Sequence, residues 1–219
     1  MKDPYNNSYQ TVIFDWDGCL ADTINTWLDV ITEEIDFFSP GITREEVVQA
    51  NVIGNFHNIS QFGINDLVIF ENKISAAINS RVELVQMNDH AKDVIIELKR
   101  HGRDIAVVTS SRRKFIQPQL DRFEILEYFD IIVTQDDVSQ LKPHPEPVEK
   151  ALSALNADRD TSIIIGDTRN DVLAGKAARI DTALYYPQLH EVIYDKDEVL
   201  GLCADYYFRE LTEVIDTVL

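Results

Sequence analysis

Asp15 and Asp17 lie two residues apart near the start of the chain, and Gly18 follows them directly. At this spacing one carboxylate can attack a substrate while the other transfers the proton that the reaction requires. The glycine allows a tight bend of the backbone beside the two side chains. A calcium loop is the alternative, but it needs oxygen ligands at alternate positions and a glutamate at the twelfth. Counted from Asp15, the fifth position is Cys19 and the twelfth is Thr26, so the calcium interpretation fails.

Four short apolar runs each end in polar residues. The runs and the residues that follow them are Thr11–Phe14 before Asp15, Ile105–Val108 before Thr109, Ile131–Val133 before Thr134, and Ile163–Ile165 before Gly166 and Asp167. Runs of this kind, rich in β-branched and aromatic residues, are typical of buried strands. The carboxyl ends of parallel strands meet at one edge of a sheet, where ligands bind. We therefore expect the polar residues to form one site.

Helical patterns alternate with these strands along the chain. They cover Ala91–Arg100, Lys114–Phe123, Pro145–Leu155 and Asp171–Ala178. The alternation predicts an α/β fold, in which a doubly wound, Rossmann-like parallel sheet has helices on both faces.

The segment from Asp22 to Met87 breaks this alternation, because it holds few convincing strands. Its helical patterns are Ile24–Phe37, Arg44–Ala50 and Asp66–Val85. The sequence therefore predicts a Rossmann-like catalytic core of residues 1–21 and 88–219 and an all-helical insert of residues 22–87. The insert has three basic and ten acidic side chains, and we interpret these charges as a solvated helix exterior.

Charge and composition exclude several classes of partner. The 219 residues include 38 acidic and 20 basic side chains, which gives a formal net charge of −18. Nucleic acids and anionic membranes repel such a chain, so we expect neither as a partner. The sequence has no apolar run of about 20 residues and no signal-peptide pattern, which indicates a cytoplasmic protein; we expect a monomer or a small homo-oligomer. Cys19 and Cys203 indicate no disulfide framework or zinc site, and we expect both to be packed apolar groups.

Four separated motifs, in order along the chain, resemble those of the haloacid dehalogenase (HAD) superfamily. The first is Asp15 with Asp17, the second Thr109, the third Lys142-Pro143 and the fourth Gly166-Asp167-Thr168-Arg169-Asn170-Asp171. The match covers roughly residues 10–22 and 88–186. The insert is similar to the helical C1-type cap of the phosphoglycolate phosphatase and β-phosphoglucomutase group. The resemblance implies a mobile cap and a phosphatase that hydrolyses a small phosphorylated metabolite.

The resemblance also implies a role for the core residues. Asp15 is the nucleophile and forms an aspartyl-phosphate, whereas Asp17 protonates the leaving group and then deprotonates the attacking water. Lys142 places its ammonium against the phosphate and the surrounding carboxylates.

Contacts with the phosphate and the substrate are expected from residues around these motifs. Thr109 and the backbone amides of Ser110 and Trp16 are expected to donate hydrogen bonds to phosphate oxygens. Arg112 follows the second motif in a locally basic stretch, where it can contact the substrate or be a surface residue at a helix start. His57 lies in a loop of the insert, where cap residues of the family reach the substrate; a purely structural role is the alternative.

A Mg²⁺ site fits the same motifs, because this ion prefers hard oxygen ligands. The resemblance implies ligands from Asp15, the backbone carbonyl of Asp17, and Asp167. Asp171 lies one helical turn beyond Asp167 and completes the metal site by tying down a metal-bound water or Lys142.

Two other functions remain open beside hydrolysis. A phosphomutase acting on a sugar phosphate would keep Asp15, Asp17, Lys142 and Asp167 and differ mainly in the cap. The segment 52–63 lacks the Thr-Arg sugar-recognition pattern associated with β-phosphoglucomutases, which favours hydrolysis. A catalytically silent phosphate-binding protein is the third interpretation, and the presence of both aspartates of the first motif disfavours it. The sequence leaves the identity of the substrate open.

Overall fold

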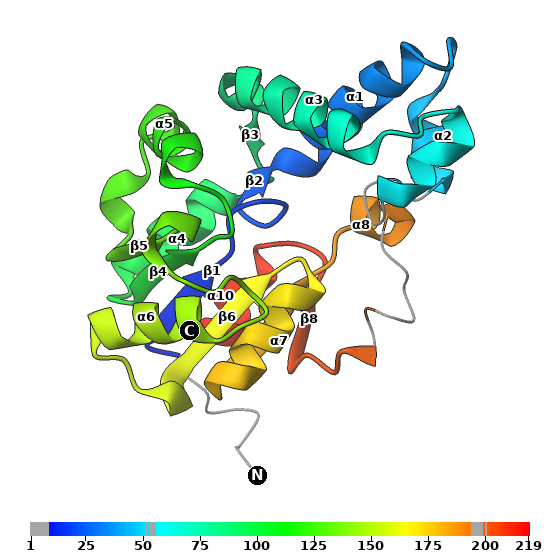
Figure 1. Cartoon of the computed structure of the whole chain (residues 1–219). Helices are drawn as coiled ribbons and strands as arrows, with labels where there is room; N and C mark the ends of the chain where they lie inside the picture. Colours follow the sequence, from blue (N-terminus) through cyan, green and yellow to red (C-terminus); the bar gives the residue numbers. More distant parts are fainter. Residues whose placement is uncertain (1–8, 51, 53–55, 194–198, 200) are drawn as a thin grey trace.

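The computed structural model describes residues 9–50, 52, 56–193, 199 and 201–219, and a parallel β-sheet lies at its centre (Figure 1). The strands of this sheet are β1 (Thr11–Phe14), β4 (Asp104–Val108), β5 (Ile131–Val133), β6 (Ser162–Gly166), β7 (Asp181–Tyr185) and β8 (Tyr206–Phe208). Their order is β5-β4-β1-β6-β7-β8, and every pairing between them is parallel. The predicted doubly wound α/β fold is therefore confirmed.

Strand β1 lies at the centre of the sheet, between β4 and β6. Phe14 is in register with Val107 of β4 and with Ile165 of β6. All four residues of β1 are buried, which explains why its sequence does not alternate between apolar and polar residues. The chain proceeds from β1 outward through β4 and β5 on one side and through β6, β7 and β8 on the other. The switch in strand order therefore lies at β1, where ligands of such sheets bind.

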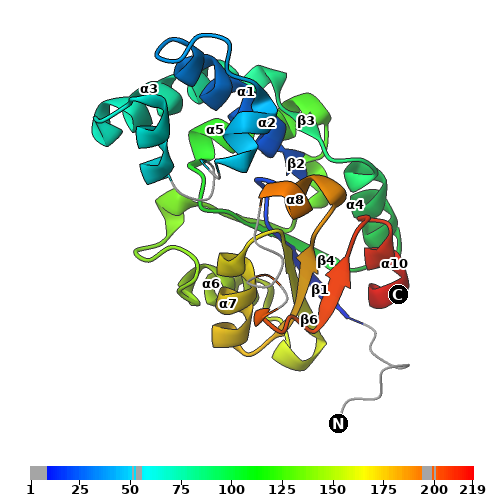
Figure 2. The same cartoon turned by 90° about the vertical axis from the view of Figure 1, so that its right-hand side faces the viewer.

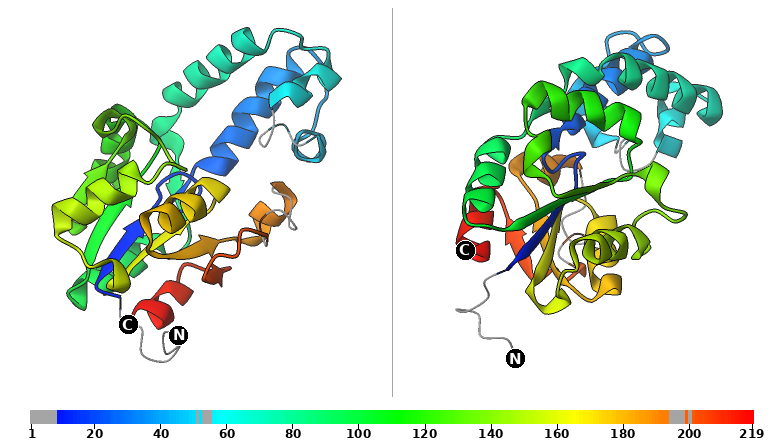
Figure 3. Two further views of the ribbon diagram at one scale, coloured as in Figure 1. Left: turned by 60° about the horizontal axis from the view of Figure 1, so that its bottom comes forward. Right: turned by 90° about the vertical axis from the view of Figure 1, so that its left-hand side faces the viewer.

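Helices cover the sheet on both faces (Figure 3). The helices that follow the cap are α4 (Ala91–Arg100), α5 (Arg113–Phe123), η3 (Leu126–Tyr128), η4 (Gln135–Asp137), α6 (Glu146–Leu155), η5 (Arg159–Thr161), α7 (Arg169–Ala178), α8 (Gln188–Ile193) and α10 (Glu213–Val218). Val12 and Phe14 pack in one apolar cluster with α4, α5 and α10, whereas Ile13 packs in another with α6 and α7. This division follows from the two-residue period of a strand, and it gives each face of the sheet its own core.

A separate group of helices lies beyond the carboxyl edge of the sheet (Figure 2). Its members are α1 (Thr23–Asp36), α2 (Arg44–Gln49), η1 (Phe56–Phe62), α3 (Leu67–Ser80) and η2 (Val82–Leu84). Apolar side chains of α1, α2, η1 and α3 form one cluster, separate from the two clusters that cover the sheet. Two short antiparallel strands, β2 (Ala21–Asp22) and β3 (Gln86–Met87), join this group to the core. We refer to residues 22–87 as the cap; the division into two units stays a prediction.

The helix expected over residues 66–85 is shorter in the structure. It begins after Asp66, whose Oδ1 accepts a 3.0 Å hydrogen bond from the backbone amide of Ile69. It ends at Ser80, because the backbone of Arg81 has a φ of −112° and a ψ of 9°, outside the range of an α-helix. The short helix η2 follows, so the single predicted helix is two elements.

Helix α8, which follows β7, reaches from the core to the cap. Leu189 and Ile193 pack with the apolar cluster of the cap, and Figure 1 shows α8 beside α2. Beyond Tyr186 the sequence carries no strong pattern, and α8 and β8 are not predicted from it.

The two cysteines have different environments. Cys19 is fully buried, as expected of a packed apolar group. Cys203 is exposed, because it lies in the connection that leads into β8, and the expectation that it is packed is wrong. Among the described residues, no helix has both the length and the apolar character needed to cross a lipid bilayer.

Candidate active site

A cavity of about 520 Å³ lies at the carboxyl ends of β1, β4 and β6, and helices α1 and α3 of the cap form its other side. The predicted site residues that line it are Asp15, Asp17, Thr109, Ser110, Arg112, Lys142 and Asp167. The polar ends of three strands therefore meet in one place, as the geometry of a parallel sheet requires.

Lys142 is buried beside the cavity, and its ammonium group is fully engaged. Nζ donates hydrogen bonds to Oδ1 of Asp15 at 2.6 Å, to Oδ1 of Asp171 at 2.5 Å and to the carbonyl of Val108 at 2.9 Å. These bonds use all three donors of the group. Lys142 therefore links the ends of β1 and β4 to the start of α7 and orients the Asp15 carboxylate.

Burial and mutual repulsion change how these groups titrate. Burial raises the pKa of Asp15 to about 7, although Lys142 acts in the opposite direction. Burial, followed by the charges of Asp15 and Asp171, raises the pKa of Asp167 well above its ordinary value. Burial alone would lower the pKa of Lys142, but the two carboxylates that it bonds outweigh burial and raise that pKa. The carboxylates are thus crowded enough that a further cation would stabilise them.

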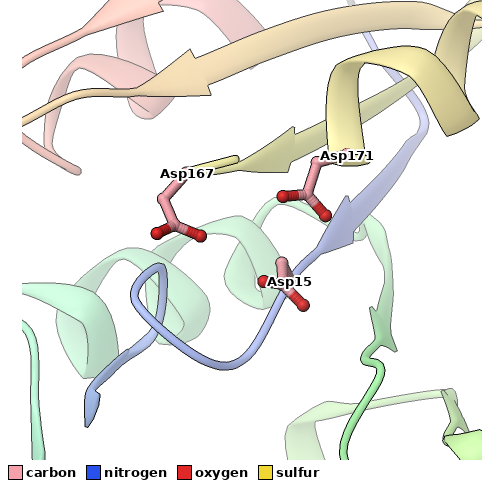
Figure 4. A group of neighbouring side chains, drawn as sticks. All are labelled: Asp15, Asp167 and Asp171. Atoms are coloured by element: carbon pink, nitrogen blue, oxygen red, sulfur yellow. The ribbon is translucent and has the colours of Figure 1, made fainter. Parts of the chain in front are cut away.

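The carboxylates of Asp15, Asp167 and Asp171 are neighbours (Figure 4), and one oxygen of each lies within 4.8 Å of the others. Oδ1 of Asp167 is buried and has no hydrogen-bond partner among the described residues. Oδ2 of Asp171 accepts hydrogen bonds from the amide and hydroxyl of Thr168 at 3.0 and 2.6 Å, and its Oδ1 is held by Lys142. A buried carboxylate oxygen without a partner is costly unless a cation meets it. The donor set fits Mg²⁺ at Asp15 and Asp167, with Asp171 in a supporting position.

Gly18 lets the loop after β1 pass close to Asp167. Its φ is +80°, and a Cβ atom at this position would lie 2.2 Å from Oδ2 of Asp167. Asn88 holds the loop by donating hydrogen bonds to the carbonyls of Gly18 and Cys19 at 3.1 and 2.7 Å. The glycine that allows the bend therefore also makes room for the carboxylate.

The Asp17 carboxylate is held by hydroxyl groups at the end of β4. Its Oδ2 accepts hydrogen bonds from Ser111 Oγ at 2.6 Å and from Thr109 Oγ1 at 3.3 Å. Burial raises the pKa of Asp17, and these two hydrogen bonds oppose the rise. A carboxyl group with a raised pKa is suited to carrying a proton for transfer. The sequence does not single out Ser111, although the polar run that ends β4 contains it.

Trp16 points into the core. Its side chain is fully buried, and Nε1 donates a 3.2 Å hydrogen bond to Oε1 of Gln119. The predicted contact of Trp16 with phosphate therefore concerns its backbone amide alone. Ser110 and Arg112 line the cavity, and their contacts with a substrate stay predictions.

His57 is exposed on η1 and is not among the residues that line the cavity. Its predicted contact with a substrate stays a prediction. Ile24 and Trp27 of α1 and Ile78 of α3 lie on the cap side of the cavity instead. The spacing of three residues between Ile24 and Trp27 places both on one face of a helix, which is the signal in the sequence that points to them.

His190 of α8 lies behind the carboxylate group, and the sequence does not single it out. Its ring is buried, and Nδ1 is 3.9 Å from Oδ2 of Asp167. The ring packs edge-on against Tyr185 and Tyr186. Burial lowers the pKa of His190 to about 4, so the imidazole is neutral near pH 7. His190 lies beyond the last motif, so the sequence does not predict its contact with Asp167.

Known proteins are similar to this chain over the segment that contains the four motifs. The family model for haloacid dehalogenase-like hydrolases matches residues 12–185, a span that contains all four motifs. Pyrophosphatase PpaX of Halalkalibacterium halodurans is 29% identical over 212 residues, which is 95% of this chain and 96% of that protein. Pyrophosphatase PpaX of Bacillus cereus strain B4264 is 31% identical over 181 residues, which is 79% of this chain and 81% of that protein.

Solved structures share the fold. A HAD-superfamily hydrolase of Geobacter sulfurreducens has a TM-score of 0.74 at 22% identity and covers 98% of each chain. A protein of Thermotoga maritima, provisionally named a β-phosphoglucomutase, has a TM-score of 0.76 at 24% identity and covers 96% of this chain and 100% of its own. At these identities the likeness concerns the fold alone.

Proposed function

Since the chain belongs to the haloacid dehalogenase-like hydrolases, as its motifs predict, we propose that it is a Mg²⁺-dependent phosphatase of a small phosphorylated metabolite. The observation that carries the proposal is the position of Asp15, which Lys142 holds in the cavity with Asp17 and Asp167 nearby. The relatives named pyrophosphatase PpaX support a hydrolase that acts on a phosphate compound.

Asp15 acts as the nucleophile. Lys142 holds its Oδ1 and so orients the carboxylate for attack on phosphorus. The attack forms a bond between Asp15 and the phosphoryl group and breaks the bond to the leaving-group oxygen. Negative charge spreads over the phosphate oxygens during the transfer, and the ammonium of Lys142 is already in place to offset it.

Asp17 moves the proton in both halves of the reaction. Its raised pKa favours a protonated carboxyl group, which gives its proton to the departing oxygen. The resulting carboxylate then takes a proton from the water that attacks the aspartyl-phosphate. This second step releases inorganic phosphate and restores both Asp15 and protonated Asp17, so no proton is left over. The hydroxyls of Ser111 and Thr109 keep Asp17 oriented throughout.

Asp15 and Asp167 would hold Mg²⁺, which when bound neutralises phosphate oxygens in a site rich in carboxylates. Asp171 helps to position Lys142. Its Oδ1 accepts a hydrogen bond from Lys142, and its Oδ2 accepts hydrogen bonds from Thr168. These bonds orient the charged groups before a substrate binds, which is what electrostatic catalysis requires.

Release of inorganic phosphate from a panel of phosphorylated metabolites, measured in millimolar Mg²⁺ and in EDTA, tests the proposal. We expect release from at least one of them in Mg²⁺, and none with Asp15→Asn. Phosphoryl exchange between sugar positions with little net release would indicate a phosphomutase. Binding of phosphate without turnover would indicate a silent binding protein. Turnover that persists in EDTA and in Asp15→Asn would contradict the mechanism.

A further inference from the structure

The two sides of the active-site cavity differ in chemistry. The core side carries the charged residues described above. The cap side includes Ile24, Thr26 and Trp27 of α1 and Ser75 and Ile78 of α3. Among the described cap residues that line the cavity, none is charged. The part of a substrate that faces the cap therefore meets apolar side chains, an indole and the hydroxyl groups of Thr23, Thr26 and Ser75.

The cations of the cap are paired away from the cavity. Residues 22–87 contain three basic residues, and none of them is among those that line the cavity. Their partners are acidic residues of α1, in the pairs Arg44 with Asp29, Lys73 with Glu34, and Arg81 with Glu33. The cap also has seven more acidic than basic side chains, so its field opposes an anion.

Among the residues that the structure describes, the cations that line the cavity come from the core. They are Lys142, whose three donors are engaged, and Arg112 at the start of α5. Arg112 follows Thr109 and Ser110 in the segment after β4, where the phosphoryl group is expected. A second anionic group held against Ile24, Trp27 and Ile78 of the cap, away from Arg112 and Lys114 of α5, would lose its hydration without gaining a cation.

Two aromatic side chains form part of the cavity wall, one from the cap and one from the core. Trp27 of the cap and Phe115 of α5 both line the cavity and are half-buried. Trp27 stacks on Phe56, with ring centroids 6.2 Å apart and an interplanar angle of 27°, so the cap supports the indole from behind. Aromatic walls of this kind favour flat apolar groups, and the cavity of about 520 Å³ has the size of a small-molecule site.

From these contacts we infer the class of substrate: a phosphate monoester whose leaving group is uncharged and carries a flat, apolar ring. Ile24, Trp27 and Ile78 of the cap, with Phe115, select this group over a second phosphate or a carboxylate. The inference rests on the proposed phosphatase function and narrows it. It sets this chain apart from its relatives that are named pyrophosphatases.

Two esters that differ by one charge test the inference. Benzyl phosphate and 4-(phosphonooxymethyl)benzoate share the ring and the reacting oxygen, and the second has a carboxylate at the far end of the ring. With Mg²⁺ present, we expect kcat/KM to be at least about tenfold higher for benzyl phosphate, because the carboxylate would be desolvated without a partner. We expect pyrophosphate to be disfavoured in the same way. Acetyl phosphate, which has no ring, reports phosphoryl transfer itself.

Two variants tie the preference to the cap. Trp27→Ala should lower the ratio of kcat/KM for benzyl phosphate to that for acetyl phosphate by about tenfold, because the ring loses its support. Ser75→Lys places a cation on an exposed position of the cavity wall, where it does not disturb packing. It should raise kcat/KM for the carboxylated ester, relative to benzyl phosphate, by up to about fivefold. Phe37→Ala removes an exposed ring that does not line the cavity and serves as the matched control.

The outcomes separate the inference from the function on which it rests. Turnover of acetyl phosphate with equal or higher kcat/KM for the carboxylated ester or for pyrophosphate would overturn the inference and leave the phosphatase function standing. A preference for benzyl phosphate that neither cap variant changes would also overturn it, because the cap would not be its source. No phosphate release in Mg²⁺ from any of the four compounds or from the panel of phosphorylated metabolites would overturn the phosphatase function itself.

Discussion

The hydroxyl of Ser111 donates a 2.6 Å hydrogen bond to Oδ2 of Asp17, across 94 residues of sequence. Thr109 reaches the same oxygen at 3.3 Å and accepts a 3.0 Å hydrogen bond from the amide of Ser111. The end of β4 thus fixes the carboxyl group that is proposed to carry the proton, while Asp15 is fixed separately by Lys142. Two aspartates two residues apart therefore have different hydrogen-bond partners, which fits the different roles proposed for them.

Loss of the Ser111 hydroxyl should slow the reaction without unfolding the protein. We expect Ser111→Ala to lower kcat by about tenfold. Acid–base catalysis contributes a rate enhancement of about 10²- to 10⁴-fold, and a misoriented Asp17 would lose part of it. Ser111→Thr keeps the hydroxyl and should retain most of the activity. Ser153→Ala, at an exposed position of α6, is the control. Equal kcat for Ser111→Ala and the control would show that Asp17 is oriented without the Ser111 hydroxyl.

The two aspartates should differ when each is replaced. Asp15→Asn removes the nucleophile, so we expect a loss of at least about 10³-fold and no phosphoenzyme. Asp17→Asn removes the proton carrier, and we expect a loss of about 10²-fold or more, smallest for substrates whose leaving group needs no proton. Trapping the phosphoenzyme by rapid acid quench distinguishes the two variants. A phosphoenzyme formed by Asp15→Asn would refute the covalent role of Asp15.

The strands and the polar residues at their ends could be predicted because both signals are local. The run Thr11–Phe14 is a strand with the predicted bounds, and Asp15 follows it at the edge of the cavity. The C-terminal end of α3 and the exposure of Cys203 could not be predicted, because they depend on the backbone at Arg81 and on how the connection to β8 folds.

Partners of the site residues were harder to predict than the residues themselves. The hydrogen bond of Ser111 to Asp17 and the approach of His190 to Asp167 join segments distant in sequence, and they exist only once β4 and α8 pack beside β1 and β6. The contribution of Trp27 to the cavity wall is difficult to predict for a different reason, because the spacing of Ile24 and Trp27 shows a shared helix face but not what that face contacts. A tryptophan on an amphipathic helix is usually part of the apolar core. That Trp27 also lines the cavity follows only from the position of α1 over it.

Lys142 should be essential for stability as well as for activity. Lys142→Met leaves the carboxylates of Asp15 and Asp171 buried without their cation. Breaking a buried ion pair in this way costs about 3 kcal/mol or more, so the denaturation midpoint in EDTA should fall clearly. Lys150→Met, at an exposed position of α6, is the control for loss of one lysine. An unchanged midpoint for Lys142→Met would mean that the carboxylates are protonated in the folded protein and need no cation.

Mg²⁺ should stabilise the folded protein through Asp15 and Asp167. A ligand that binds only the folded state adds about 2.7 kcal/mol at 100 times its dissociation constant, so the thermal midpoint should be higher in millimolar Mg²⁺ than in EDTA. Asp167→Asn removes one ligand and also relieves repulsion among the buried carboxylates. It should therefore raise the midpoint in EDTA and abolish most of the shift with Mg²⁺. Asp160→Asn, at an exposed position, should keep the shift. A full shift in Asp167→Asn would place the ion elsewhere.

The end of β5 should contribute stability that depends on pH. Burial acts to raise the pKa of Asp137, but the hydroxyl and amide of Thr134, together with Arg113, outweigh it and lower that pKa. A carboxyl whose pKa is lower in the folded than in the unfolded state stabilises the fold at pH values above its unfolded pKa. This stability is lost as the pH falls below about 4 and through the lower folded-state value.

Asp137→Asn measures this contribution directly. At pH 7 the variant should be less stable by about 1 kcal/mol, the usual cost of a lost cap. The difference from the original protein should shrink as the pH falls below about 4, because the protonated carboxyl loses its advantage over the amide. Denaturant unfolding at several pH values gives the free energy of unfolding of the original protein and of Asp137→Asn as a function of pH. Asp93→Asn, which replaces an exposed aspartate of α4, is the control. A difference in the free energy of unfolding that stays constant down to acid pH would mean that the variant is destabilised by altered packing rather than by the lost charge.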